Sequence, residues 1–163
     1  APHKVPQAKV LRTAVASGVY TTTQGLSIDM FGLSAKLGQQ ENQKIEVKAL
    51  TDSTISLHFP AYDVPLVGDF PYSNAAQKEY QLDKVVVKFQ PDGTMSFASK
   101  VKIETVFQMT PAKMKKEDIP YRTFPDTPIS YEGTIKGKEL TVKITAQPGK
   151  MPFPVTYNYV GQK

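Results

Sequence analysis

Apolar and polar residues alternate with a period of two in short segments that recur from about residue 15 to the end of the chain. Gly, Pro, Asn and Asp separate these segments. Such alternation is typical of half-buried antiparallel strands, because successive side chains of a strand point to opposite faces of its sheet. Helical periodicity is hard to find. The pattern therefore predicts an all-β fold.

The clearest pair of strands covers 129–136 and 139–146. Ile129, Tyr131 and Ile135 share one face of the first strand, and polar residues occupy the other face. The second strand carries an apolar residue at every other position. A glycine and a lysine separate the two, which is the length of a tight β-hairpin connection. We therefore expect these segments to pair as a hairpin.

Further strands are expected wherever the same alternation returns. They cover 45–49, 55–59, 85–89 and 101–107, with others near 18–23, 26–31 and 153–161. A chain of 163 residues with this pattern fits one domain. We expect a flexible N-terminal segment over 1–14 and, over 15–163, a single antiparallel barrel of about eight strands.

Two stretches, 60–81 and 108–127, resist assignment as strands because each holds three prolines. Loops longer than about 12–15 residues in a compact domain are usually lids or binding loops. Both stretches are therefore predicted to be long loops that pack against the barrel. Their aromatic residues are Tyr62, Phe70, Tyr72, Tyr80, Tyr121 and Phe124.

The residue types that enzymes commonly use are scarce. The chain has no cysteine, which excludes disulfides, thiolate nucleophiles and thiolate zinc sites. Its two histidines are His3, in the polar N-terminal stretch, and His58, on the polar face of its predicted strand. No phosphate-binding glycine motif or EF-hand spacing occurs. We predict a protein that is not an enzyme and that uses no metal or cofactor.

Charge and hydropathy limit the partners. The net charge is +5, but the basic residues are scattered rather than gathered in one stripe, so no nucleic-acid partner is predicted. No apolar run approaches the roughly 20 residues of a membrane-spanning helix. The sequence begins with Ala1 rather than Met, which hints at a processed, exported chain.

Four segments carry a resemblance to a known family. They are Gly18-Val19-Tyr20-Thr21, Phe59-Pro60 leading into Pro65-Leu66-Val67-Gly68, the hairpin that begins at Tyr131-Glu132-Gly133, and Met151-Pro152-Phe153-Pro154-Val155-Thr156. Over roughly 15–161 the chain resembles the calycin-like β-barrel domains of exported proteins and lipoproteins of gut Bacteroides-type bacteria. The resemblance implies a lipocalin-like barrel located in the cell envelope or outside the cell, with no established activity.

A barrel of about eight strands encloses just enough space for side chains or for one small ligand. The residues expected to point inward therefore form either a plain core or the wall of a pocket. They are Val47, Ile55, Leu57, Phe59, Val85, Val87, Phe89, Val101, Ile103, Phe107, Tyr131, Ile135, Val142 and Ile144.

The predicted ligand-binding residues lie in the two proline-rich stretches, at the expected mouth of the barrel. They are Tyr62, Phe70, Tyr72, Tyr121, Arg122 and Phe124. The favoured hypothesis is a non-enzymatic barrel that binds a small apolar or amphipathic molecule, which requires a cavity of roughly 300 Å³ or more. The alternative is a cell-envelope interaction module that binds a protein or glycan through an exposed apolar patch.

Three other features allow two readings each. Met109 and Met114 provide either an adaptable apolar contact or ordinary packing. The run Lys113-Met114-Lys115-Lys116-Glu117-Asp118 either meets an anionic surface or forms a solvated loop. His58 is expected to be solvated rather than a ligand.

Overall fold

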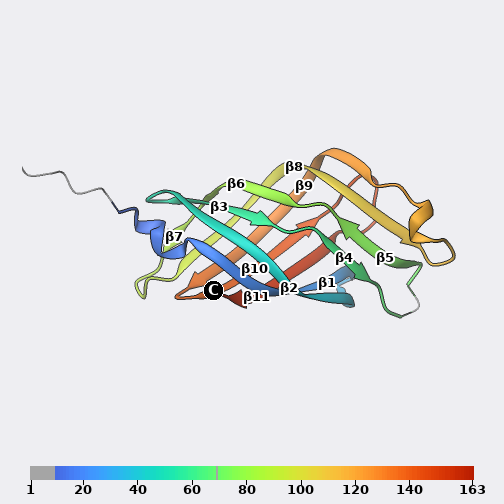
Figure 1. Cartoon of the computed structure of the whole chain (residues 1–163), viewed down its shortest axis with the longest axis horizontal. Coiled ribbons are helices and arrows are strands. Elements are labelled where there is room, and N and C mark those ends of the chain that lie inside the picture. The colour runs from blue at the N-terminus through green and yellow to red at the C-terminus, as the bar shows by residue number, and fades with distance from the viewer. Residues whose placement is uncertain (1–9, 69) are drawn as a thin grey trace, which may run out of the picture.

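The computed structural model describes residues 10–68 and 70–163 and contains one antiparallel β-sheet with two short 3-10 helices (Figure 1). The all-β prediction is confirmed. The 3-10 helices are η1 (Arg12–Ala16) and η2 (Lys116–Asp118). The strands are β1 (Gly18–Met30), β2 (Leu33–Thr51), β3 (Thr54–Phe59), β4 (Tyr62–Pro65), β5 (Tyr72–Gln77), β6 (Tyr80–Val86), β7 (Lys88–Phe89), β8 (Met95–Pro111), β9 (Arg122–Lys136), β10 (Glu139–Ala146) and β11 (Val155–Gln162).

The sheet is strongly curled, because the strands at each of its ends come close to a strand near its other end. Hydrogen-bonded neighbours follow the order β4-β5-β8-β9-β10-β11-β1-β2-β3-β6, and β7 pairs with β8. The long strand β8 thus meets β7 near its start, where Phe89 faces Met95, and β5 near its end, where Gln77 faces Phe107. Since β6 leads directly into β7, the chain encloses a barrel-like interior.

The β4–β5 hairpin also reaches β2. The backbone N–H of Val67 donates to the carbonyl of Leu37 at 2.7 Å. A glycine makes this approach feasible, because a Cβ atom at Gly38 would lie only 2.6 Å from the carbonyl oxygen of Pro65. The strands therefore come together around the barrel at this end as well.

The core lies inside the curl. Of the residues expected to point inward, Phe89, Val101 and Ile103 are partly buried and all the others are buried. In the middle of the barrel Phe59 stacks on Tyr80 with ring centroids 4.7 Å apart, and Tyr159 lies beside Phe59 at 5.1 Å. The middle of the barrel is therefore filled by aromatic side chains.

The two predicted long loops are shorter than expected. The stretch 60–81 contains β4, β5 and the start of β6, and the stretch 108–127 contains the end of β8 and the start of β9. The prolines do not interrupt these strands. Pro65 and Pro111 are the last residues of β4 and β8, and Pro125 lies where the β8–β9 register shifts, so none interrupts a regular ladder. The connections that remain in these stretches are 60–61, 66–71, 78–79 and 112–121.

The N-terminal segment was expected to be flexible over 1–14. Residues 1–9, including His3, lie outside the described residues. Residues 12–16 form η1, in which the Thr13 hydroxyl donates to the Thr51 carbonyl at 2.5 Å and the Arg12 guanidinium lies 3.9 Å from the centre of the Phe89 ring. Figure 1 shows η1 at one end of the barrel, opposite the connections that follow β4 and β8.

Candidate functional site

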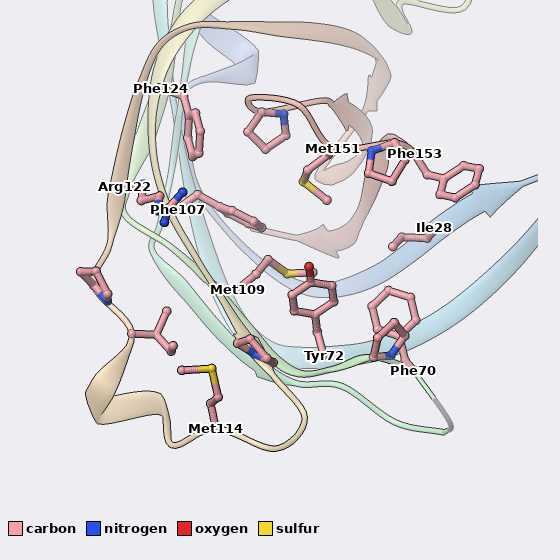
Figure 2. Close-up of a pocket in the computed structure, with 16 residues that line it drawn as sticks. Ile28, Phe70, Tyr72, Phe107, Met109, Met114, Arg122, Phe124, Met151 and Phe153 are labelled. Atoms are coloured by element: carbon pink, nitrogen blue, oxygen red, sulfur yellow. The ribbon is translucent and has the colours of Figure 1, made fainter.

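A pocket of about 740 Å³ lies among the strand ends and connections at the end of the barrel opposite η1 (Figure 2). Its walls come from the ends of β1, β5, β8 and β9 and from the connections that follow β4, β8 and β10. The lining residues are Ile28, Phe70, Pro71, Tyr72, Phe107, Met109, Pro111, Met114, Ile119, Pro120, Arg122, Phe124, Pro148, Met151, Pro152 and Phe153.

One wall of the pocket consists of side chains from β8 and β9, and the register between these strands decides which side chains lie together. Phe107, Met109 and Pro111 occupy alternate positions of β8, so they share the inner face of the sheet. Arg122 is the direct cross-strand partner of Phe107, and Phe124 follows it by two residues on the same face. Pairing of β8 with β9 therefore places the guanidinium of Arg122 on the same wall as aromatic and thioether side chains.

The pocket as a whole is almost wholly apolar and carries adaptable side chains. Met109, Met114 and Met151 approach the pocket from separate elements (Figure 2). Methionine has an unbranched, polarizable side chain that adapts to irregular shapes. The pocket is suited to an apolar body whose outline the wall can follow.

The connection 112–121 is held in place by Gln108. Its buried side-chain amide donates to the carbonyl of Ile119 at 2.6 Å and to the carbonyl of Lys116 at 3.2 Å. At the start of the connection, the backbone N–H of Ala112 donates to the carbonyl of Pro71 at 2.9 Å. These bonds position Met114 and Ile119, which line the pocket.

An ion pair is a second attachment of the connection 112–121. Lys116 pairs with Asp63, and the Asn74 side-chain amide donates to the same carboxylate at 2.9 Å. Burial acts to raise the pKa of Asp63, but the hydrogen bonds from Lys116 and Asn74 outweigh it and hold that pKa below its ordinary value. The hydrogen bond to Asp63 likewise raises the pKa of Lys116. Lys116 is thus already engaged by a carboxylate.

Arg122 has no such partner among the described residues. No carboxylate among residues 10–68 and 70–163 lies within 4.0 Å of its guanidinium. Figure 2 shows Arg122 on the pocket wall beside Phe107, with the Tyr72 hydroxyl pointing into the same space. The pocket therefore offers a positive charge and a hydroxyl group at its surface, which a ligand with an anionic group can use.

Four of the predicted binding residues line this pocket together: Phe70, Tyr72, Arg122 and Phe124. Tyr62 lies elsewhere, buried in the core with its ring edge-on to Tyr157 at 5.1 Å. Tyr121 is also outside the pocket.

Tyr121 is exposed, and its ring lies 4.1 Å from the ammonium group of Lys78. Tyr121 and Arg122 point to opposite sides because they are neighbours in an extended segment.

Several lining residues were not among the predicted binding residues. The sequence favours neither an adaptable contact nor ordinary packing for Met109 and Met114, and both line the pocket. Met151 and Phe153 lie in the connection between β10 and β11. The sequence predicts a strand near 153–161, whereas β11 begins at Val155. The signal that marks this connection is its run of apolar residues interrupted by prolines, which cannot donate to a ladder.

Deeper in the barrel, four tyrosines form hydrogen-bonded or packed pairs. The hydroxyls of Tyr80 and Tyr159 lie 2.8 Å apart, and the Tyr157 hydroxyl donates to Gln77 Oε1 at 2.9 Å. Burial raises the pKa of Tyr62, Tyr80, Tyr157 and Tyr159 above that of a free phenol. These phenols are therefore neutral at physiological pH.

Among the described residues that line the pocket, Arg122 and Tyr72 are the titratable ones. His58 lies on the wall of the barrel with its Nε2 atom 3.4 Å from Glu79 Oε2. Within the described part of the chain, no three His, Asp or Glu side chains are grouped closely enough to hold a metal ion. The described residues also contain no helix of the length and hydropathy needed to cross a bilayer.

Comparisons with known proteins agree with this geometry. Among solved structures, the chain is similar to a crystal structure from Bacteroides fragilis described as a "putative outer membrane protein", with a TM-score of 0.64 and 18% sequence identity. The similarity covers 96% of this chain and 54% of that chain, so this chain spans about half the length of its neighbour. At this identity the likeness shows the fold alone.

A comparison with curated proteins gave no match. The family model of the calycin-like beta-barrel domain matches residues 16–162. This range includes every strand of the sheet and every residue that lines the pocket. The chain therefore belongs to the calycin-like β-barrel domain family.

Proposed function

We propose that this domain is a non-enzymatic carrier or receptor for one small amphipathic molecule. The observation that carries the proposal is the pocket of about 740 Å³, whose apolar wall is interrupted by the guanidinium of Arg122, which has no carboxylate within 4.0 Å among the described residues. Ligand pockets usually have volumes of about 300–1,000 Å³, with apolar walls and few polar anchors. The apolar part of the ligand contacts Met109, Phe107 and Phe124, and its anionic group pairs with Arg122.

The cell envelope is the proposed location. The structural neighbour is described as a "putative outer membrane protein". The sequence also resembles domains of exported proteins and lipoproteins. A pocket for amphipathic molecules suits that location, because lipids and their breakdown products are abundant at membranes.

The alternative function is an envelope interaction module that binds a protein or glycan. It is favoured by the exposed side chains of Phe31, Leu33 and Val67 at the mouth of the barrel. The two functions differ in what the pocket does, because an interaction module does not need to take up a small molecule.

A matched pair of fluorescent probes tests the proposal. 1-Anilinonaphthalene-8-sulfonate and N-phenyl-1-naphthylamine share an aromatic body, but only the first carries a negative charge. After extraction of any resident ligand, we expect both probes to bind the folded protein. Arg122→Gln should weaken the sulfonate by about tenfold, the value of one charge-assisted contact, and leave the neutral probe unchanged.

Met109→Trp is the second variant, because added volume at the centre of the pocket should weaken both probes (Figure 2). Lys100→Gln on the barrel wall is the control for charge removal, and the thermal transition of each variant confirms folding. Failure of the wild type to bind either probe contradicts the proposal and favours the interaction module.

A further inference from the structure

Exposed apolar side chains gather around the mouth of the pocket. Phe31 is 92% exposed, Leu33 75%, Val67 61% and Met114 51%. These four residues are called the rim below. Phe31, Val67 and Met114 lie in the connections that follow β1, β4 and β8, and Leu33 is the first residue of β2. Figure 1 shows these connections at the same end of the molecule. Single exposed apolar side chains are ordinary, but several of them at one end of a molecule provide the material of a contact surface.

Contacts tie the rim to the pocket. The ring of Phe31 lies edge-on to Phe153, with centroids 5.8 Å apart, and Phe153 lines the pocket. Val67 is held beside β2 by its hydrogen bond to Leu37, and Met114 is itself a lining residue. Whatever covers the rim therefore also faces the opening of the pocket.

Phe31 occupies a backbone position that does not favour phenylalanine. It has a φ of 51°, and Gly32, which follows it, has a φ of 77°. Positive φ at both central residues is the pattern of a type I′ hairpin turn, in which Asn-Gly is preferred and a bulky first residue is strained. Because the ring is also 92% exposed, burial in the core does not compensate for the strain.

Basic side chains adjoin the apolar ones. Lys113 and Lys115 flank Met114, Lys150 precedes Met151, and Lys36 follows Leu33 by three residues, all with exposed side chains. The exposed carboxylates described in the same turns are Asp29, Glu117 and Asp118. The whole chain carries a net charge of +5. The lysines can therefore reach anionic groups that lie in the plane of the rim.

We infer that the rim docks on an anionic lipid bilayer, with Phe31, Leu33 and Met114 entering the interface and the lysines contacting headgroups. Separate apolar tips with adjacent lysines suit a fluid surface, whereas protein interfaces are depleted in lysine. In this orientation the pocket opens toward the membrane, so an amphipathic molecule can pass between the two without crossing water. The docking itself does not depend on which molecule the pocket holds.

Vesicle flotation tests the inference. The probes are vesicles of phosphatidylcholine alone and of phosphatidylcholine containing phosphatidylglycerol. The rim variant is Phe31→Asn with Leu33→Ser, and asparagine suits the positive φ of position 31, so this hairpin should fold. The control is Val86→Ser with Val160→Ser, since these valines are 57% and 59% exposed on the barrel wall.

The wild type and the control should float with the anionic vesicles, and the rim variant should lose affinity by at least about tenfold, since two apolar side chains leave the interface. Lys113→Gln with Lys115→Gln should reduce the preference for phosphatidylglycerol. Absence of wild-type binding, or equal binding by rim and control variants, overturns the inference. A concentration-dependent dimer that the rim variant abolishes also overturns it, because a second copy then covers the rim.

The probe-binding assay separates the two proposals. A rim variant that still takes up both naphthalene probes but no longer floats shows that docking is a property of the rim alone. A wild type that floats but binds neither probe retains the docking inference and contradicts the proposed ligand.

Discussion

The guanidinium of Arg122 lies opposite Phe107 on a wall made of apolar side chains, without a carboxylate partner in the described part of the chain. Arg122 is an exposed residue, and a solvated cation without an ion pair contributes little to folding. Phe31, at the mouth of the pocket, also contributes little to folding, because its backbone is strained and its ring is exposed. Both residues are better explained by binding than by stability.

For Arg122 this leads to a prediction about stability as well as binding. Arg122→Leu should leave the free energy of unfolding within about 0.5 kcal/mol of the wild type or raise it, since leucine suits the apolar wall. The anionic naphthalene probe should lose its advantage over the neutral one. Denaturant unfolding and probe titration measure the two effects. A loss of more than roughly 1 kcal/mol would show instead that the guanidinium supports the fold.

For Phe31 the predicted change in stability is a gain. Phe31→Asn should raise the free energy of unfolding by roughly 0.5–1 kcal/mol, because asparagine adopts positive φ with less strain. Differential scanning calorimetry should show a higher melting temperature, while vesicle binding falls. A lower melting temperature would mean that the contact between Phe31 and Phe153 stabilises the hairpin more than the strain weakens it.

Among the elements, the connection 112–121 depends on very few attachments. It joins β8 to β9 and is fixed by Gln108, by the pair of Lys116 with Asp63, and by the backbone hydrogen bond from Ala112 to Pro71. Because it carries Met114 and Ile119, its position determines the width of the pocket. Loosening this element should change access to the pocket before it changes the barrel.

Gln108→Ala tests that dependence. The substitution leaves the carbonyls of Lys116 and Ile119 without their side-chain donor, so local opening of the connection should become easier by about 1–2 kcal/mol. Hydrogen exchange of the backbone amides in 112–121 should accelerate, while exchange in β9 and β10 stays slow. Uniform acceleration through the whole sheet would instead assign Gln108 a role in global folding.

The sequence predicted the elements with the strongest alternation and missed those with the weakest. The predicted hairpin of 129–136 and 139–146 corresponds to the last part of β9 and to β10. These two strands pair along their whole predicted length without a register shift. By contrast, β2 runs from Leu33 to Thr51, although only 45–49 shows alternation. Its polar first half is a strand because it pairs with β1, which is a tertiary effect that local pattern does not report.

The candidate site was predicted only in part for a similar reason. Phe70, Tyr72, Arg122 and Phe124 stood out as aromatic or charged residues in proline-rich stretches, and they line the pocket. Tyr62 has the same composition around it but belongs to β4, whose pairing with β5 turns its ring into the core. Composition identifies candidates near the mouth, whereas strand register decides which of them face the pocket.

Over the whole molecule, the barrel is divided into a filled middle and an open end. Phe59 and the buried tyrosines occupy the middle, η1 lies at one end, and the pocket lies at the other. The filled part supplies the stability that allows a cavity of about 740 Å³ to persist beside it. Stability and binding are thus assigned to different parts of one core.

The buried tyrosines make the filled part sensitive to alkali. Burial raises the pKa of Tyr62, Tyr80, Tyr157 and Tyr159 in the folded state above the ordinary value of 10.0, so the neutral phenols favour folding below that pH. Above about pH 10 the unfolded phenols ionise first. The free energy of unfolding should then fall by up to about 1.4 kcal/mol per pH unit for each buried phenol.

Absorbance and circular dichroism during an alkaline titration measure this effect. The phenolate absorbance of the buried tyrosines should appear together with the loss of β-sheet signal. Full ionisation of all tyrosines near pH 10 with the sheet intact would show that these side chains are accessible to solvent.

The central claim is that the open end holds one small amphipathic molecule. Native mass spectrometry of the protein purified from its own host, followed by solvent extraction, tests it most directly. We predict a wild type that carries a single releasable molecule with an apolar body and an acidic group, and a Met109→Trp variant that carries none. Wild type and variant of bare protein mass, with no uptake of either naphthalene probe by the wild type, would contradict the claim.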